Sequence, residues 1–175
     1  DFAVVLKKLT AAGARAILKM GTGPSTITTA KALKDLSVGM PMFTSTEDIA
    51  VLEQAANVLG KDLYFVPGQT QVFDSLPDSD PTKKVILQFV APWRELYGKR
   101  DPFWAGRGYD ARMVLAGALK SANSIDGEKV RDALNNVADF RGTSGLYNFK
   151  ADHHGVTNNP YVLAQIVNAN VVLLK

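Results

Sequence analysis

The first 70 residues alternate stretches of helical spacing with short apolar runs, and this alternation limits the possible folds more than any other feature. In the first stretch Phe2, Val5 and Leu9 recur at helical spacing, and a short apolar run follows Gly13. Such a run has the length of a strand buried in a parallel sheet. Helices are expected over residues 2–12, 24–38 and 47–59, and strands over residues 14–20, from residue 42, and over residues 63–66. The pattern predicts an α/β fold in which right-handed crossovers join parallel strands and ligands bind at the carboxyl ends of the strands.

Residues 68–82 are rich in Gly, Pro, Ser, Asp and Gln, which is typical of a linker or a crossover. Beyond them the apolar spacing is helical, and three helices are expected to begin near Asp80, Asp101 and Asp126. Pro92 is expected to kink the first of these helices. Helices with apolar faces and no strands between them either form a bundle or cover a sheet built from other residues.

Strands are expected again near the end of the chain. Residues 145–149 form a short strand-like run, and a polar turn follows at residues 150–155. Residues 161–167 and 171–174 flank Asn168, a residue type that adopts positive φ in tight turns. The end of the chain is therefore predicted to form a β-hairpin.

Composition excludes several classes of protein. Of the 175 residues 46% are hydrophobic and 21% are charged, which are values of a globular chain rather than of a disordered or membrane-embedded one. The net charge is only +3 and the basic residues are scattered, which disfavours a nucleic-acid binder. The absence of Cys excludes disulfides, a thiolate nucleophile and Cys-ligated zinc. The chain begins inside an amphipathic pattern, and we expect it to be part of a longer polypeptide.

The segment GTGPS at residues 21–25 lies between an expected strand and an expected helix, where backbone N–H groups bind phosphates in nucleotide-binding proteins. Thr26 stands where a dinucleotide fingerprint requires Gly, and the Lys of a nucleoside-triphosphate loop is absent. Two interpretations remain. Either the hydroxyls of Thr22 and Ser25 and the free N–H groups bind a small carboxylate, or the segment is an ordinary capping turn.

The stretch of residues 101–110 is unusual because three aromatic residues and an Arg gather at the start of an expected helix that also contains two glycines. Glycines at such a place allow a ligand or another backbone segment to approach closely. Aromatic rings beside Arg107 suit an amino acid or an aromatic carboxylate. The alternative is that the aromatic residues belong to the core and Arg107 is a surface charge.

His153 and His154 are adjacent, so on a strand they point to opposite faces, and on a turn they lack a third metal ligand at a useful spacing. No G-x-S-x-G segment supplies a nucleophile. We therefore expect no metal site, no cofactor and no catalytic residue, and a structural or solvated role for both histidines.

The alternation, the GTGPS loop and the segments PMFTSTE, GYDARMVLAGAL and FRGTSGLYNFKADHHG together resemble the type I periplasmic solute-binding proteins. The branch that they resemble is the leucine/isoleucine/valine-binding protein family, which comprises receptors of ABC transporters. The resemblance extends over nearly the whole chain and follows the order of these segments in the family. It implies a two-lobed fold in which the chain crosses three times between the lobes and a ligand is trapped when the lobes close.

The resemblance also implies how the chain is divided between the lobes. Residues 1–72 resemble an α/β segment of the second lobe, residues 73–155 a mostly helical return through the first lobe, and residues 156–175 the final strands of the second lobe. The first-lobe strands that these helices cover would lie in an N-terminal half of the same protein, which is an expected partner. The turn with His153 and His154 matches the last crossover, which implies a hinge role for it.

Ligand-binding positions follow from the same resemblance. Thr22 matches the first loop of the second lobe, Thr46 stands where members that bind amino acids often carry an acid, and Trp104 matches an aromatic wall of the first lobe. A neutral Thr46 favours an aromatic, aliphatic or amide-bearing carboxylate over an α-amino acid. The complete set of candidate ligand-binding residues is Thr22, Ser25, Thr44, Thr46, Trp104, Arg107 and Tyr109.

Three classes of function are distinguished. The first is the substrate-binding component of an ABC transporter, which captures a small solute in the periplasm or outside the cell and delivers it to a membrane permease. The second is a ligand-sensing regulatory domain with the same fold, which a transmembrane helix or a kinase module in the full gene would favour. The third is an α/β enzyme in which His153 or His154 is a base.

Overall fold

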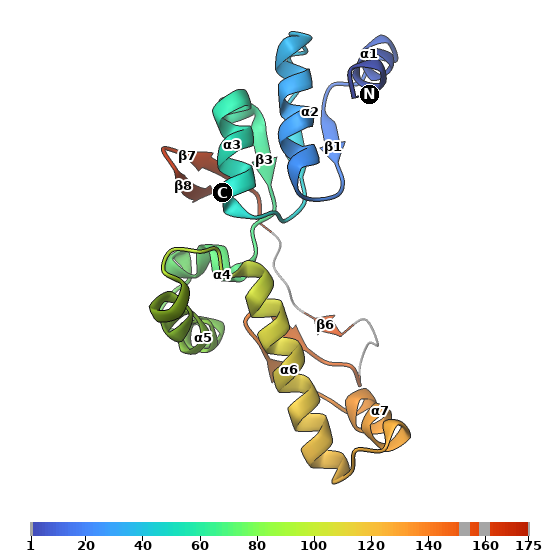
Figure 1. Ribbon diagram of the computed structural model, residues 1–175, viewed down its shortest axis with the longest axis vertical. Helices are drawn as coiled ribbons and strands as arrows, with labels where there is room; N and C mark the ends of the chain where they lie inside the picture. The colour runs from blue at the N-terminus through green and yellow to red at the C-terminus, as the bar shows by residue number, and fades with distance from the viewer. Residues whose placement is uncertain (1, 151–154, 158–161, 175) are drawn as a thin grey trace. The chain divides into compact units, whose positions relative to one another are not determined.

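The computed structural model of the chain describes residues 2–150, 155–157 and 162–174. It divides into two compact units (Figure 1). Unit 1 comprises Asp1–Pro67 and Tyr161–Lys175, and unit 2 comprises Gly68–Pro160. Each unit has its own secondary structure and its own buried core.

Unit 1 is a five-stranded sheet with the strand order β1-β2-β3-β7-β8. The strands β1, β2 and β3 are parallel, β7 is antiparallel to β3, and β8 is antiparallel to β7. The predicted α/β fold and its helix–strand alternation are confirmed. The elements are α1 (Phe2–Ala11), β1 (Ile17–Lys19), α2 (Pro24–Asp35), β2 (Met42–Thr44), α3 (Ile49–Leu59), the 3-10 turn η1 (Gly60–Asp62), β3 (Leu63–Phe65), β7 (Ala164–Val167) and β8 (Asn170–Leu173).

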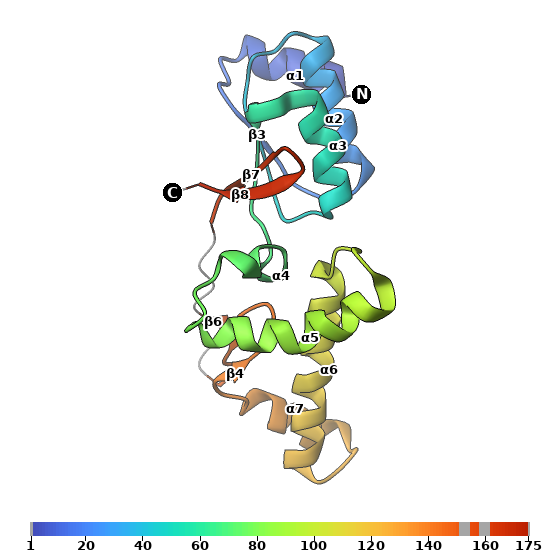
Figure 2. The same ribbon diagram turned by 90° about the vertical axis from the view of Figure 1, so that its left-hand side faces the viewer.

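One face of this sheet is buried against helices. Alternate residues of β2 and β3 are buried, with Met42, Leu63 and Phe65 fully inaccessible, as the period of two in a strand requires. They share a core with residues of α2 and α3, which lie on the same side of the sheet (Figure 2). The opposite face carries Leu18, which is 72% exposed, and a stacked pair formed by two aromatic rings of β2 and β3. The helices of unit 1 therefore leave much of this opposite face uncovered.

The predicted hairpin at the end of the chain is confirmed. Its strands β7 and β8 are joined by the two residues Asn168 and Ala169, and their φ angles are 50° and 60°. Two positive φ angles define the two-residue turn whose twist matches that of antiparallel strands.

The start of α3 differs from the sequence-based prediction. The expected helix began at Glu47 after a run of hydroxyl residues, but the helix begins at Ile49. The carboxylate of Asp48 caps it by accepting a 2.8 Å hydrogen bond from the Ala50 N–H. An Asp is among the strongest N-caps, so the hydroxyl residues before it are not needed for capping.

Unit 2 consists of helices and a small antiparallel sheet with the strand order β4-β5-β6. The three long helices expected after Asp80 are confirmed, and Pro92 lies inside the first of them without ending it. The short strands β4 and β6 were not predicted. The elements are α4 (Gln69–Val72), the 3-10 turn η2 (Phe73–Ser75), α5 (Pro81–Tyr97), α6 (Phe103–Ala122), α7 (Gly127–Asn135), β4 (Phe140–Arg141), β5 (Leu146–Tyr147) and β6 (Val156–Thr157).

The segment of residues 68–82 is not the plain linker that its composition suggested. It contains α4 and η2, and Phe73 is 4% exposed because it packs against Ile86 and Val90 of α5. An aromatic side chain that finds an apolar helix face becomes buried even when polar and turn-forming residues surround it. This part of the segment therefore contributes to the core of unit 2.

A buried carboxylate ties α6 to the segment before β5. Asp110 is 1% exposed and accepts hydrogen bonds from the N–H groups of Thr143 (2.7 Å) and Ser144 (2.9 Å) and from the Tyr147 hydroxyl (3.1 Å). A Cβ atom added to Gly142 would lie 2.6 Å from this carboxyl group, so the segment can approach it only with a glycine there. Burial, together with the negative charge of Asp110, raises the pKa of Tyr147 to about 12.

The two glycines near the start of α6 are predicted to respond oppositely to substitution by Ala. A Cβ atom at Gly106 would lie 2.9 Å from the Thr143 hydroxyl and 3.2 Å from a methyl group of Thr70, whereas nothing lies within 4 Å of a Cβ at Gly108. Gly108→Ala should stabilise the helix by about 1 kcal/mol, and overpacking at Gly106 costs about 1–3 kcal/mol. In urea unfolding Gly108→Ala should raise the midpoint and Gly106→Ala should lower it. Stabilisation by both variants would contradict the packing described.

Tyr147→Phe is predicted to change the dependence of stability on alkaline pH. Because the folded state raises the pKa of Tyr147 from 10.0 to about 12, the folded state holds the phenol proton more tightly. This stabilisation is complete below pH 10 and is lost as the pH rises towards 12. At pH 8 the variant should be less stable than the wild type by about 1–2 kcal/mol, because the bond to Asp110 is lost, and the difference should shrink above pH 10. Urea unfolding at several pH values measures this difference in the free energy of unfolding. Tyr97→Phe serves as the control, because Tyr97 is 47% exposed. A difference that is the same at pH 8 and pH 11 would contradict the assignment.

Candidate functional site

Two loops of unit 1 lie at the same edge of its sheet (Figure 1). β1 and β2 are parallel neighbours, and their last residues, Lys19 and Thr44, are directly paired. The loop from β1 to α2 and the loop from β2 to α3 therefore leave the sheet side by side. In open α/β sheets this carboxyl edge is where ligands bind. The structure thus places Thr22 on the first loop and Ser25 in the first turn of α2, which follows it. Thr44 is the last residue of β2, and Thr46 lies on the second loop.

The four hydroxyl residues differ in their access to solvent. Thr22 is exposed, whereas Ser25 and Thr46 are half-buried. The Ser25 hydroxyl donates to the Thr22 carbonyl oxygen at 3.3 Å. Thr44 is 3% exposed, and among the described residues its Oγ1 has no hydrogen-bond partner. A solute at this edge would therefore meet Thr22, Ser25 and Thr46 before Thr44.

Below these hydroxyls lies a buried polar cluster formed by Lys19, Thr26 and Glu47. The Lys19 ammonium donates to the Thr26 hydroxyl and to the Gly21 carbonyl oxygen, both at 2.7 Å. The Thr26 hydroxyl in turn donates to Glu47 Oε2 at 3.2 Å. Lys19 is 8% and Glu47 2% exposed. Burial lowers the pKa of Lys19 and the charge of Glu47 opposes this change.

Glu47 connects the two loops through backbone groups. Its Oε2 accepts the N–H of Gly23 in the first loop, and its Oε1 accepts the N–H of Asp48 in its own loop at 2.9 Å. The N–H of Gly23 is one of the groups that the sequence interpretation left free for a small carboxylate. The protein's own carboxylate already occupies it.

The sequence interpretation missed Lys19 and Glu47. Lys19 carries a signal that could have found it, because it follows Ile17 by two residues and so shares the inward face of a short strand. A charged residue on that face needs a buried partner. Glu47 was interpreted as part of the helix start, and nothing in the sequence links it to Gly23.

In unit 2 Trp104 and Arg107 lie together at the start of α6. The guanidinium carbon of Arg107 lies 4.4 Å from the ring centre of Phe103 and 5.5 Å from that of Trp104. Trp104 is 50% exposed and Arg107 is also exposed, whereas Phe103 is buried. An accessible indole beside a cation can hold an aromatic or aliphatic carboxylate.

Tyr109 is not part of this group. Its ring packs 5.1 Å from the ring of Phe89, which in turn lies 5.9 Å from the ring of Trp93. These contacts join α6 to α5. The structure therefore gives Tyr109 the packing role that the sequence left as an alternative, and gives Trp104 and Arg107 accessible positions.

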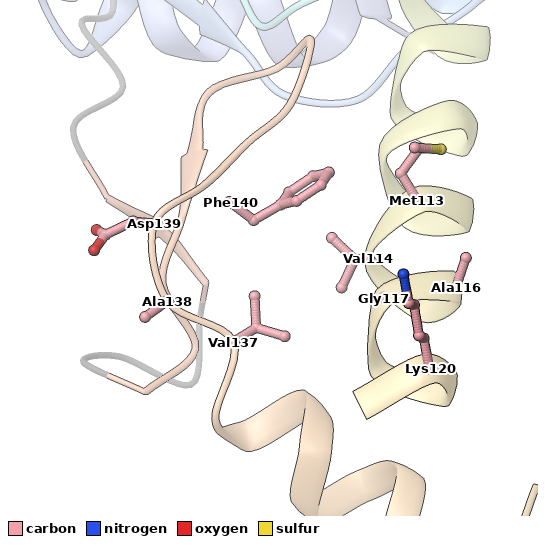
Figure 3. A pocket seen from close by; sticks show the side chains of 9 residues that line it. All are labelled: Met113, Val114, Ala116, Gly117, Lys120, Val137, Ala138, Asp139 and Phe140. Carbon is pink, nitrogen blue, oxygen red and sulfur yellow. The ribbon is translucent and has the colours of Figure 1, made fainter. Parts of the chain in front are cut away.

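Unit 2 also contains an open apolar groove with a volume of about 640 Å³ (Figure 3). It lies between α6 and the segment that precedes and enters β4, and the ring of Phe140 points towards Val114 and Met113 across it. Its volume is in the range of small-molecule sites. The groove is lined by Met113, Val114, Ala116, Gly117, Lys120, Val137, Ala138, Asp139 and Phe140.

Other classes of site find no support in the described part of the chain. Within it, no group of three or more His, Cys, Asp or Glu side chains could hold a metal ion. Among its helices none is both long and apolar enough to span a membrane. His153 and His154 lie outside the described residues, so their hinge, metal and catalytic interpretations stay predictions.

Comparison with known proteins gives a family and a fold. A family model described as periplasmic binding protein matches residues 1–170. An extracellular ligand-binding receptor from Rhodopseudomonas palustris HaA2 superposes with a TM-score of 0.81 at 23% identity, over 100% of this chain and 52% of that one. A leucine-binding protein from Thermotoga maritima gives 0.75 at 24% identity, over 100% and 48%. A fatty acid ABC transporter substrate-binding protein from Thermomonospora curvata gives 0.73 at 16% identity, over 100% and 46%.

These comparisons agree with the fold described above. The solved structures share the fold of the chain, and the chain spans about half the length of each of them. The family match extends over nearly every described residue and includes both loops at the carboxyl edge of the sheet. The chain belongs to the periplasmic binding protein family, and its α/β fold is that of a part of a type I member.

Proposed function

We propose that this chain is part of the substrate-binding component of an ABC transporter, which captures a small solute between two lobes and delivers it to a permease. The observation that supports this most is the pair of hydroxyl-bearing loops at the carboxyl edge of a parallel sheet, in a chain of the periplasmic binding protein family. Capture of this kind needs shape, hydrogen-bond donors and an aromatic surface, and it needs no nucleophile or general base.

The chemistry of the accessible groups favours a small carboxylate as the solute. Arg107 provides the cation for the carboxylate, and the half-exposed ring of Trp104 provides an apolar surface. The hydroxyls of Thr22, Ser25 and Thr46 are uncharged and suit the polar, uncharged parts of the solute. Structural relatives include a leucine-binding protein and a fatty acid ABC transporter substrate-binding protein, and leucine and fatty acids both combine a carboxylate with an aliphatic part.

The division into lobes is part of the same proposal. Residues 1–72 and 156–175 would belong to the second lobe and residues 73–155 to the first, and each of these boundaries lies five residues from that between units 1 and 2. An N-terminal half of the same protein would complete the first lobe, and the receptor would act in the periplasm or outside the cell. In support, the chain spans about half of its structural relatives, and helices of unit 2 expose large apolar side chains. Those at least 44% exposed on α5 and α6 are Leu87, Leu96, Tyr97, Trp104 and Leu115.

Trp104→Ala is predicted to weaken solute binding by the full-length protein by about tenfold or more, because an accessible aromatic wall supplies much of the contact area. A thermal-shift screen of branched-chain amino acids, aromatic acids and short amides would first identify a binding solute. Calorimetry would then compare wild type, Trp104→Ala and the control Ile125→Ala, whose side chain is 93% exposed beyond the end of α6. Failure of all solutes in the screen would count against the function, and unchanged affinity of Trp104→Ala would reject this residue.

The 175-residue chain alone is predicted to self-associate through unit 2. Leu96 is 74% and Leu115 45% exposed, and apolar surface of this kind favours association in water. Light scattering should show species larger than a monomer, and the variant Leu96→Lys with Leu115→Lys should shift the distribution towards the monomer. A monodisperse monomer for the unmodified chain would contradict the proposal that a further segment covers these helices.

A further inference from the structure

Glu47 is buried just before the N-cap of α3, and its carboxylate binds groups beyond its own loop. It accepts hydrogen bonds from the Gly23 N–H, from the Thr26 hydroxyl and from the Asp48 N–H. The first two donors lie in or next to the loop that follows β1, and the third lies in the loop that follows β2. One side chain therefore joins the two loops to which the proposed function assigns solute binding.

We propose that Glu47, supported by Lys19 through Thr26, is the positioning residue that fixes the β1–α2 loop against the β2–α3 loop. This inference rests on the proposed function for its meaning, because it concerns how the solute-binding hydroxyls are held. The hydrogen bonds on which it stands are independent of any solute.

The backbone conformation of Gly23 shows which part of the β1–α2 loop Glu47 holds. Its φ of 81° and ψ of −155° lie in a region that residues with a side chain rarely adopt. This conformation turns its N–H towards Glu47, whereas an N–H at the start of a helix is otherwise available to a bound anion. Glu47 therefore supplies an internal anion for α2, and a solute would meet the hydroxyls of Thr22 in the loop and of Ser25 in the first turn of α2 instead.

The charges explain why Lys19 belongs to the same arrangement. A carboxylate that is 2% exposed is costly to bury without a compensating charge and hydrogen bonds. Lys19, which is 8% exposed, reaches it through the Thr26 hydroxyl, which accepts from the ammonium and donates to the carboxylate. Apolar side chains could fill the same volume, but they could not hold the Gly23 N–H or set the orientation of the loop.

Asp48 provides a matched control. It is the next residue in the chain and also an acid, and its carboxylate caps α3 through the Ala50 N–H. It accepts no described hydrogen bond from the β1–α2 loop. Asp48→Asn should therefore act on α3 alone, whereas Glu47→Gln should act on both loops.

The test follows the amide of Gly23 in the full-length protein labelled with ¹⁵N-glycine. In Glu47→Gln the amide of Gly23 should shift and should exchange with solvent about tenfold faster or more, because a neutral amide replaces its charged acceptor. Lys19→Met should move the same signal in the same direction. Asp48→Asn should leave it unchanged. The unfolding midpoint of each variant, measured in parallel, separates a local change from general destabilisation.

The chemical shift of the Gly23 amide is a readout that general destabilisation does not move, because destabilisation acts on all glycine amides, whereas loss of the Glu47 acceptor acts on Gly23. An unchanged Gly23 amide in Glu47→Gln, or equal effects of Glu47→Gln and Asp48→Asn, would overturn the proposal. Failure of every solute in the thermal-shift screen would instead count against the proposed function and would leave the amide result as the test of this inference.

Discussion

Parallel pairing of β1, β2 and β3 is the constraint on which the candidate site of unit 1 depends. Because each strand runs in the same direction, each connection must return along a helix, and the loops that follow β1 and β2 leave from one edge. The buried residues Met42 and Phe65 hold this sheet against α2 and α3. Hydroxyls that are distant in sequence therefore come to neighbouring loops through the topology alone.

Both units use a buried carboxylate to hold an irregular segment against a regular element. Glu47 binds backbone N–H groups of two loops in unit 1, and Asp110 binds those of Thr143 and Ser144 in unit 2. A charged acceptor forms stronger hydrogen bonds than a neutral one, and burial increases the stability that is lost when a donor is removed. In each case a glycine, Gly23 or Gly142, permits the approach or conformation of the held segment.

Local patterns in the sequence were sufficient to predict most helices and strands. They were insufficient to predict the hydrogen bonds of Glu47 and Asp110. Apolar spacing predicted the alternation of unit 1, and Asn168 marked the hairpin, because such signals lie within one element. The two-residue strands β4 and β6 have no period to detect. The bonds from Glu47 to Gly23 and from Asp110 to Thr143 join residues distant in sequence, so only the fold shows them. The sequence singled out the hydroxyl residues of the candidate site, which stay predictions, but not the bonds of Glu47 that join the two loops.

The state of the polar groups fits the capture of a solute that we propose. The buried carboxylates of Glu47 and Asp110 are occupied as acceptors of N–H and O–H groups, so their chemistry is directed inward to the fold. The accessible candidates are hydroxyls in unit 1 and the Trp104–Arg107 pair in unit 2, groups that suit recognition of polar atoms, apolar surface and charge. If Glu47 fixes the two loops as we propose, they would lose little conformational entropy when a solute binds, and such preorganisation favours binding.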